Sequence, residues 1–208
     1  TLTTLLTEVQ RRILAVNQEM QQNGQPKLFE HLIGRVKTPA SMEEKCLRKG
    51  YPVTTTSALR KCKDAVGIRI VCNFIDDIDR CLEYFKHASW CSIVQEKDYI
   101  KNAKPNGYRS YHIILDVVTP HVDIDGHTPG HYFVEVQLRT IAMDSWASLE
   151  HAMKYTHNIA NPQRTEKELK RCADQLASCD VQMQTIRQLI NATDYVKASE
   201  LSCVFSSL

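Results

Sequence analysis

Two stretches decide the fold, EKDYIKNAKPNGYRSYH at 96–112 and EVQLRT at 135–140. From 133 to 139, Val, Val and Leu alternate with Glu, Gln and Arg, which is the period of a strand with one buried face and one polar face. Residues 111–117 alternate in a similar way. If these two strands pair in one sheet, His112 lies beside Glu135 on its open face.

A turn rich in Lys, Asn and Gly, Lys104-Pro105-Asn106-Gly107, leads into the strand at 111–117 and is followed by Tyr108. Backbone amides and Lys104 suit a phosphate, and a tyrosine ring suits stacking on a flat base. The turn therefore predicts a site for a phosphorylated ligand that carries a base. The alternative is that Glu135 and His112 are ordinary solvated side chains on an open sheet face.

A second group of cations surrounds a short predicted helix. Arg35 and Lys37 precede this helix, Lys45 lies within it, and it begins either at Thr38 or at Ser41. The free amides and the dipole of a helix N-terminus favour an anion, and the neighbouring cations strengthen the effect. We expect a phosphate site here, with a capped surface helix as the alternative.

Asp64 stands shortly before an apolar strand predicted at 68–74, which puts its carboxylate at the mouth of the sheet. An amphipathic helix is predicted next, at 75–85. The polar connection at 118–131 is interpreted as a hairpin loop, because its Asp-x-Asp-Gly run lacks the other ligands of a calcium loop. Its three histidines are expected on the surface: His121, His127 and His131.

Amphipathic helices are predicted near both ends of the chain. Apolar residues recur at three- and four-residue steps over about the first twenty residues and again from Leu169 to Ile190. The second helix needs a surface to cover its apolar stripe, which is the domain itself, the first helix or another subunit. A further helix after Thr140 is expected to bury one stripe, made of Ala142, Trp146, Leu149 and Met153.

The composition is that of an ordinary soluble protein. The chain has 208 residues, of which 43% are hydrophobic and 24% charged, and no apolar run approaches the roughly 18 residues of a membrane span. The eight cysteines show no metal-ligand spacing, so we expect mostly buried thiols and a cytoplasmic protein. The net charge of +2 argues against bulk binding of DNA or RNA. A local basic pocket is expected instead, drawn from Arg35, Lys37, Lys45, Arg69, Lys101, Lys104, Arg109 and Arg139.

Taken together, four motifs resemble the synthetase domain of the RelA/SpoT-type alarmone synthetases. They are NGYRSYH at 106–112, EVQLRT at 135–140, RVKTPAS at 35–41 with Lys45, and DAVGIRIV at 64–71. The tract that follows Thr140 looks like the small members with a single synthetase domain. The chain contains no His-Asp dipeptide, which is the signature of the family's hydrolase domain.

The resemblance implies a nucleotidyltransferase-like α/β (α+β) fold, with a mixed sheet of about five strands flanked by helices. We divide the chain into an N-terminal helix at 1–25, a synthetase domain at 26–160 and a helical extension at 161–208 that packs on the domain or on a partner subunit. The resemblance also implies transfer of pyrophosphate from ATP to the 3′-hydroxyl of GDP or GTP. The products are ppGpp or pppGpp and AMP, and the cofactor is Mg²⁺.

The same resemblance implies roles for individual residues. Asp64 and Glu135 are the catalytic and metal-binding carboxylates, and Glu135 binds the metal, orients the 3′-hydroxyl or takes its proton. The ATP side consists of Arg35, Lys37, Ser41, Lys45 and Arg69. The GDP or GTP side consists of Lys104, Asn106, Tyr108, His112 and Gln137.

Two other functions fit parts of the pattern. A different nucleotidyltransferase would share Asp64, Glu135 and Mg²⁺ but release pyrophosphate instead of AMP. A noncatalytic RNA-binding module would use the same cations and Tyr108, with a strong dependence on salt, but would not need two carboxylates facing its ligand. The two terminal helices also make a homo-oligomer the expected assembly, with a tetramer as one candidate.

Overall fold

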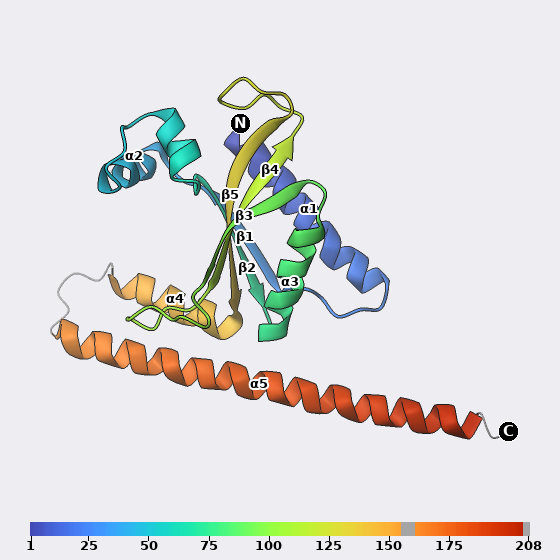
Figure 1. Cartoon of the computed structure of the whole chain (residues 1–208). Coiled ribbons are helices and arrows are strands. Elements are labelled where there is room, and N and C mark those ends of the chain that lie inside the picture. Colours follow the sequence, from blue (N-terminus) through green and yellow to red (C-terminus); the bar gives the residue numbers. More distant parts are fainter. Residues whose placement is uncertain (155–160, 206–208) are drawn as a thin grey trace.

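The computed structural model describes residues 1–154 and 161–205, and it contains a five-stranded mixed sheet with helices around it (Figure 1). This arrangement confirms the predicted fold class. The elements are α1 (Leu2–Gln22), β1 (His31–Val36), α2 (Pro39–Arg48), a π-helical turn η1 (Ser57–Lys61), β2 (Val66–Cys72), α3 (Ile75–His87), β3 (Cys91–Asp98), β4 (Tyr111–Thr119), β5 (Gly130–Thr140), α4 (Ile141–Lys154) and α5 (Pro162–Phe205).

The strands lie in the order β1-β2-β5-β4-β3, and β2 and β5 run parallel while the other neighbours are antiparallel. β2 is shifted by two residues from the range predicted for it. Its pairing with β5 begins at Val66, opposite Val134, and Phe74 is the extended residue that precedes α3. Pairing with a central strand, which the local pattern does not contain, therefore decides where β2 begins.

The main core lies between one face of the sheet and the helices α1 and α3 (Figure 1). Along β4 and β5 the alternate residues Ile113, Leu115, Val134 and Val136 are fully buried, which confirms the predicted strand period. Burial of each such side chain contributes about 1.5–3 kcal/mol. β1 approaches α1 closely at Gly34, where an added Cβ would lie 2.6 Å from a methyl carbon of Leu6.

The other face of the sheet is flanked by α2 on one side and by α4 on the other (Figure 1). α2 begins at the first of its two predicted starts. Thr38 is the N-cap, its Oγ1 accepts a hydrogen bond from the amide of Ser41 at 3.3 Å, and Pro39 is the first helical residue. Pro39 suits this place because its missing N–H is one that the first turn leaves unpaired in any case.

α4 follows β5 without a loop, and the stripe that it buries agrees with the predicted one only in part: Trp146 is buried as predicted. Met143, Trp146 and Ala147 are its buried residues, whereas Leu149 is 48% exposed, so the prediction for Leu149 was wrong. Trp146 and Ala147 pack against Ala173 of α5, and the Nε1 of Trp146 donates to the carbonyl of Leu169 at 2.8 Å. The position of α5 therefore sets which stripe of α4 is buried.

α5 uses two kinds of contact along its length. Its first half packs apolar residues against α4, but further along Gln184 and Arg187 bind Asp76 and Asp77 at the start of α3. In this second half the domain does not cover the predicted apolar stripe, because Met183, Ile186 and Ile190 are more than half exposed. Another subunit stays the predicted surface for this part of the helix. The predicted domain boundary at 160 falls within 155–160, outside the described residues. No helix in the described part of the chain is long and apolar enough to cross a membrane.

Candidate active site

The open face of the sheet carries polar side chains from three adjacent strands. β2 supplies Arg69, β4 supplies His112, and β5 supplies Glu135 and Gln137. His112 pairs with Gln137 across the ladder, so Glu135 is its diagonal neighbour on the same face. The Nδ1 of His112 lies 3.5 Å from Oε1 of Glu135, which confirms the predicted proximity.

Asp64 lies at the entry of β2 and is only 6% exposed. Its Oδ2 forms ion pairs with Lys37, which follows β1, and with Lys45 of α2. Its Oδ1 is buried and has no hydrogen-bond partner within the described part of the chain. A buried, unpartnered carboxylate oxygen is costly unless a cation or a donor fills the place, and hard divalent ions prefer such oxygen ligands.

Glu135 is a second carboxylate whose surroundings favour its charged form. Burial acts to raise its pKa, but the hydrogen bond and charge of His112, the hydrogen bond from Gln137 and the charge of Lys45 outweigh burial and lower the pKa to about 2. The Nε2 of Gln137 donates to Oε2 of Glu135 at 3.1 Å. Glu135 is therefore ionised at neutral pH.

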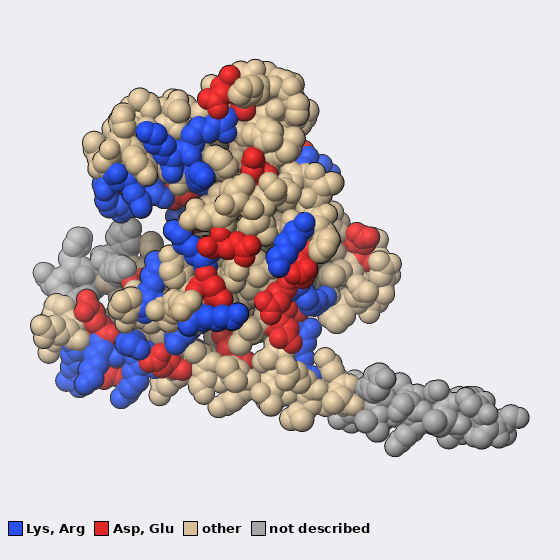
Figure 2. Space-filling view, in the orientation of Figure 1, with Lys and Arg blue, Asp and Glu red and all other residues tan. Residues whose placement is uncertain are grey.

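Two hollows share these two carboxylates. The larger has a volume of about 430 Å³, and Figure 2 shows Lys and Arg over α2 and along the adjoining hollow. The smaller, about 50 Å³, lies on the β1 side. The larger is lined by Lys45, Lys49, Tyr51, Lys61, Cys62, Lys63, Asp64, Gln95, Lys97, Tyr99, Lys104, His112, Ile114 and Glu135. The smaller is lined by Ile33, Gly34, Arg35, Lys37, Asp64, Gly67, Ile68, Arg69, Glu135 and Gln137.

The loop 104–109 brings an aromatic ring to the edge of the larger hollow. The ring of Tyr108 lies 5.9 Å from that of His112, and its hydroxyl is 2.8 Å from Nε2 of His112. The Nζ of Lys104 lies 4.9 Å from the centre of the Tyr108 ring and 4.7 Å from that of Tyr99. A cation above a pair of rings marks a place where a flat aromatic group can also stack.

A chain of hydrogen bonds runs from Arg139 towards Glu135. Arg139 can only donate, and its Nη2 donates to the Tyr108 hydroxyl at 2.9 Å. The Tyr108 hydroxyl lies 2.8 Å from Nε2 of His112, and the opposite ring nitrogen of His112 faces Glu135. Arg139 also donates to Asp144 at 2.9 Å, and Asp144 in turn binds Arg69 at 3.3 Å. The two hollows are thus joined behind the carboxylates by one polar network.

Several residues predicted for the site lie elsewhere. Asn106 donates to Glu150 of α4 at 3.2 Å, and Ser41 is an exposed residue in the first turn of α2. Neither lines one of the two hollows. Lys101 is 86% exposed and Arg109 turns towards α5, so the prediction that these two cations belong to the basic pocket was wrong. Arg139, predicted for the same pocket, is buried and lines neither hollow.

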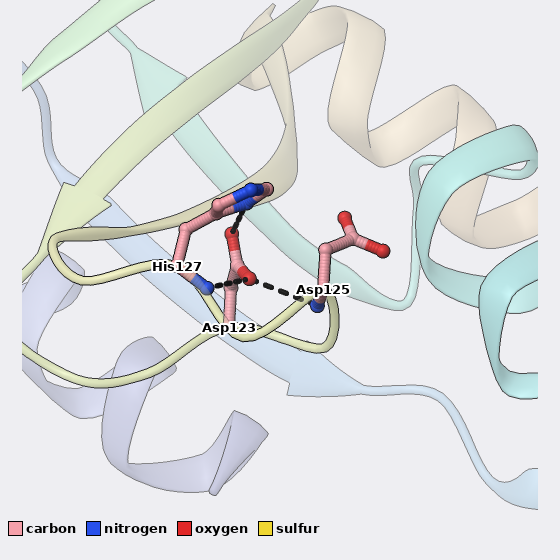
Figure 3. A group of neighbouring side chains, drawn as sticks. All are labelled: Asp123, Asp125 and His127. Atoms are coloured by element: carbon pink, nitrogen blue, oxygen red, sulfur yellow. Dashed lines mark hydrogen bonds and ion pairs between the residues drawn. The ribbon is translucent and has the colours of Figure 1, made fainter.

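The loop between β4 and β5 contains a group of possible metal ligands, Asp123, Asp125 and His127 (Figure 3). The carboxylate oxygens of Asp123 already have partners: they accept hydrogen bonds from the amides of Asp125, His127 and His131. Asp123 also forms an ion pair with Arg60 at 3.0 Å. Burial acts to raise the pKa of Asp123, but these donors hold it well below its usual range. The geometry favours an anchor that fastens this loop to η1. The histidines at 121, 127 and 131 are exposed, as predicted.

Comparison with known proteins gives this geometry a context. A family model described as "Region found in RelA / SpoT proteins" matches residues 34–160, and these include every catalytic and nucleotide-binding position proposed from the sequence. The chain belongs to the RelA/SpoT family. Relatives include the GTP pyrophosphokinases YwaC and YjbM of Bacillus subtilis. YwaC is 38% identical over 78% of this chain and 76% of its own length, and YjbM is 35% identical over 76% and 72%.

Solved RelA/SpoT-type structures resemble the chain beyond the matched region. Small alarmone synthetase 1 from Bacillus subtilis, bound to its product pppGpp, superposes with a TM-score of 0.79 at 30% identity, over 90% of this chain and 93% of that one. The same synthetase bound to AMPCPP gives a TM-score of 0.72 at 27% identity, over 91% and 93%. The fold shared with these small synthetases therefore extends over about nine-tenths of the chain.

The sequence reasoning missed several residues that line the larger hollow of this RelA/SpoT site, among them Lys61, Lys63, Lys97 and Tyr99. A signal for two of them was present. Gln95 and Lys97 alternate at the end of β3, Tyr99 continues the same period directly after it, and all three line the hollow, so a period-two pattern over this stretch would have found them. No such pattern predicts the position of Lys63, whose backbone adopts a left-handed φ of 59° that is rare for lysine.

Proposed function

We propose that this protein is a (p)ppGpp synthetase that transfers pyrophosphate from ATP to the 3′-hydroxyl of GTP or GDP and releases AMP. The observation that carries the proposal is the pair of hollows that share Asp64 and Glu135. A displacement at phosphorus needs two substrates in line and neutralisation of charge more than it needs covalent help. Two hollows with carboxylates between them and cations around them meet those needs.

On the ATP side, the cations belong to two adjacent groups. Arg35 and Arg69 line the smaller hollow, where their planar guanidinium groups suit the adenine ring. Lys37 and Lys45 are bound to Asp64 and suit the phosphates. The amide of Ser41 already donates to its N-cap Thr38, so Ser41 would contact a phosphate only through its exposed hydroxyl. Binding of ATP would give these lysines a second anion to contact.

Mg²⁺ is the expected cofactor, and the donor set fits it. Asp64 offers a buried oxygen without a partner, and Glu135 is ionised, so both residues would hold the ion. When bound, Mg²⁺ neutralises charge on the transferred pyrophosphoryl group. The pKa of about 2 makes Glu135 a weak base, which favours metal binding and orientation of the 3′-hydroxyl as its roles over capture of the proton.

On the acceptor side, Tyr108 and Lys104 are proposed to hold the guanine nucleotide. The ring of Tyr108 would stack on the base, and Lys104, now above that ring, would turn towards the phosphates. His112 and Gln137 flank Glu135 and suit the ribose. Asn106 would act on the backbone of the loop, because its Oδ1 accepts from the amide of Tyr108 at 3.1 Å.

The decisive experiment incubates the chain with Mg²⁺, labelled ATP and either GDP or GTP, and separates the nucleotide products. The proposal expects AMP together with ppGpp or pppGpp in equal amounts. Release of pyrophosphate without AMP would instead identify a different nucleotidyltransferase. Binding of RNA that weakens steeply with salt, with no turnover, would favour the noncatalytic alternative.

The assembly is proposed to be a homo-oligomer formed through the outer face of α5. Between Gln175 and Ile190 the charged residues are Asp180 and Arg187, and both bind the domain. The exposed side of this segment is uncharged and bears Val181, Met183, Ile186, Leu189 and Ile190. Light scattering of the whole chain would count the subunits, and a monomer would refute this part. We also propose that the protein acts in the cytoplasm, as its cysteine pattern predicts.

A further inference from the structure

The loop 104–109 rests on α5 through Arg109, a residue that does not line either hollow. We propose that Arg109 is a positioning residue for the acceptor nucleotide, because it fastens this loop to α5 and so fixes the place of Tyr108 beside His112. The identity of the acceptor as a guanine nucleotide rests on the proposed function. The fastening itself rests on the contacts of the loop.

Arg109 makes a three-part contact across the boundary between the loop and α5. Its Nη1 donates to the carbonyl of Ala173 at 3.2 Å and to that of Gly107 at 3.3 Å. Its Nη2 donates to Oδ1 of Asp174 at 3.1 Å. Hydrogen bonds from Lys170 and from Arg109 lower the pKa of Asp174, so this carboxylate remains ionised at neutral pH. One planar guanidinium thus joins the loop backbone to the backbone and a side chain of α5.

Gly107 brings the loop into direct contact with the same turn of α5. A Cβ placed on Gly107 would lie 2.6 Å from the Cβ of Ala173, and its φ of +94° is one that other residues rarely adopt. Ala173 is itself buried against Trp146. The loop therefore has no room to shift towards α5, and Arg109 opposes movement away from it.

The loop transmits this constraint to the site because it is a closed turn. The amide of Gly107 donates to the carbonyl of Lys104 at 2.8 Å, and the amide of Lys104 donates to the carbonyl of Tyr108 at 3.1 Å. Lys104 and Tyr108 consequently move together with Gly107. Release of the Arg109 contact would let both residues tilt relative to His112, whose own position is fixed in β4.

The test compares Arg109→Ala with Arg171→Ala. Arg171 lies on the same helix, is 70% exposed and pairs with Glu168 at 3.1 Å, so its loss removes an ordinary surface ion pair. We expect Arg109→Ala to raise the KM for GTP roughly three- to tenfold, the scale of one or two lost hydrogen bonds, with the KM for ATP within about twofold of wild type. Arg171→Ala should leave both constants unchanged. Arg109→Lys should recover part of the loss, because it keeps the charge beside Asp174.

Two measurements do not depend on turnover. Calorimetric titration should show weaker binding of GDP to Arg109→Ala, and hydrogen exchange should be faster in peptides that contain residues 104–109. Asp174→Ala should add little to the effect on GTP when combined with Arg109→Ala, because both remove one contact.

Equal increases in the KM for GTP and for ATP, accompanied by a lower Tm, would show a merely structural role and overturn the proposal, as would unchanged GDP affinity and exchange. If wild type forms no AMP from ATP and GTP, the proposed function fails. The titration and the exchange measurement then still decide whether Arg109 positions the loop for a guanine nucleotide.

Discussion

The two carboxylates of the site are held in opposite ways. Asp64 lies at the entry of a strand, bound by lysines from two other segments, and one of its oxygens is buried without a partner. Glu135 lies in the middle of the central strand β5, and His112 and Gln137 on the same sheet face contact it. The position of Asp64 therefore depends on cations that bind it, whereas the position of Glu135 is fixed in advance by the sheet. Substitutions at Asp64 and at Glu135 should therefore impair different properties of the protein.

The largest effect is expected at Asp64. Asp64→Asn should lower the rate of AMP formation at least about a hundredfold, because the charge that attracts Mg²⁺ is lost and metal contacts in such reactions contribute several kcal/mol. Circular dichroism should show that the fold is kept. Asp116→Asn, at the far end of β4 beside His131, is the matched control and should remain active. A normal rate in Asp64→Asn would mean that the metal is bound elsewhere.

The lowered pKa of Glu135 should make the free energy of unfolding depend on pH in the acid range. Its pKa falls from 4.5 to about 2 on folding, so the ionised form stabilises the fold above pH 4.5, and this stabilisation is lost as the pH falls to about 2. The full difference amounts to at most about 3 kcal/mol. Urea unfolding of wild type and Glu135→Gln from pH 2 to 6 measures it. A gap between the two proteins that does not shrink in acid would contradict the low pKa.

Substitution of Tyr108 should weaken the binding of GDP and leave the binding of ATP nearly unchanged. Tyr108→Ala should weaken GDP binding roughly ten- to hundredfold, since a stacked base is worth about 1–3 kcal/mol. Tyr108→Phe should retain much of the affinity, although Arg139 loses the hydroxyl that it contacts. Titration of GDP and of a nonhydrolysable ATP analogue separates stacking from packing against Trp146. Equal loss for both ligands would assign Tyr108 to packing.

The smallest effects distinguish two residues of α2. Lys45→Ala should raise the KM for ATP by about tenfold, because one phosphate cation is lost near Asp64. Ser41→Ala should change it by less than about twofold, since the hydroxyl of Ser41 is exposed and outside both hollows. Initial rates at varied ATP and saturating GTP provide the comparison. A larger loss in Ser41→Ala than in Lys45→Ala would reverse the order of importance within this helix.

Local sequence patterns predicted those parts of the site that lie on regular strands. The alternation around Glu135 and His112 placed both on the open face. Of the two predicted starts of α2, the one at Thr38-Pro39 is correct. These features depend on neighbours one to four residues away, which a pattern contains. Asp64 was placed at the mouth of the sheet for the same reason, because the strand after it was apolar.

The sequence by itself therefore determined the family, the sheet and the residues of the open face. The tertiary structure alone decided which helix faces are covered and which way the loop side chains turn. Leu149 is exposed and Arg109 turns away from the site, because α5 packs where α4 and the loop 104–109 meet it. The contact of Trp146 with Leu169 spans 23 positions and that of Arg109 with Ala173 spans 64, and the free energy that selects them depends on the shapes of both partners. No local period carries that information.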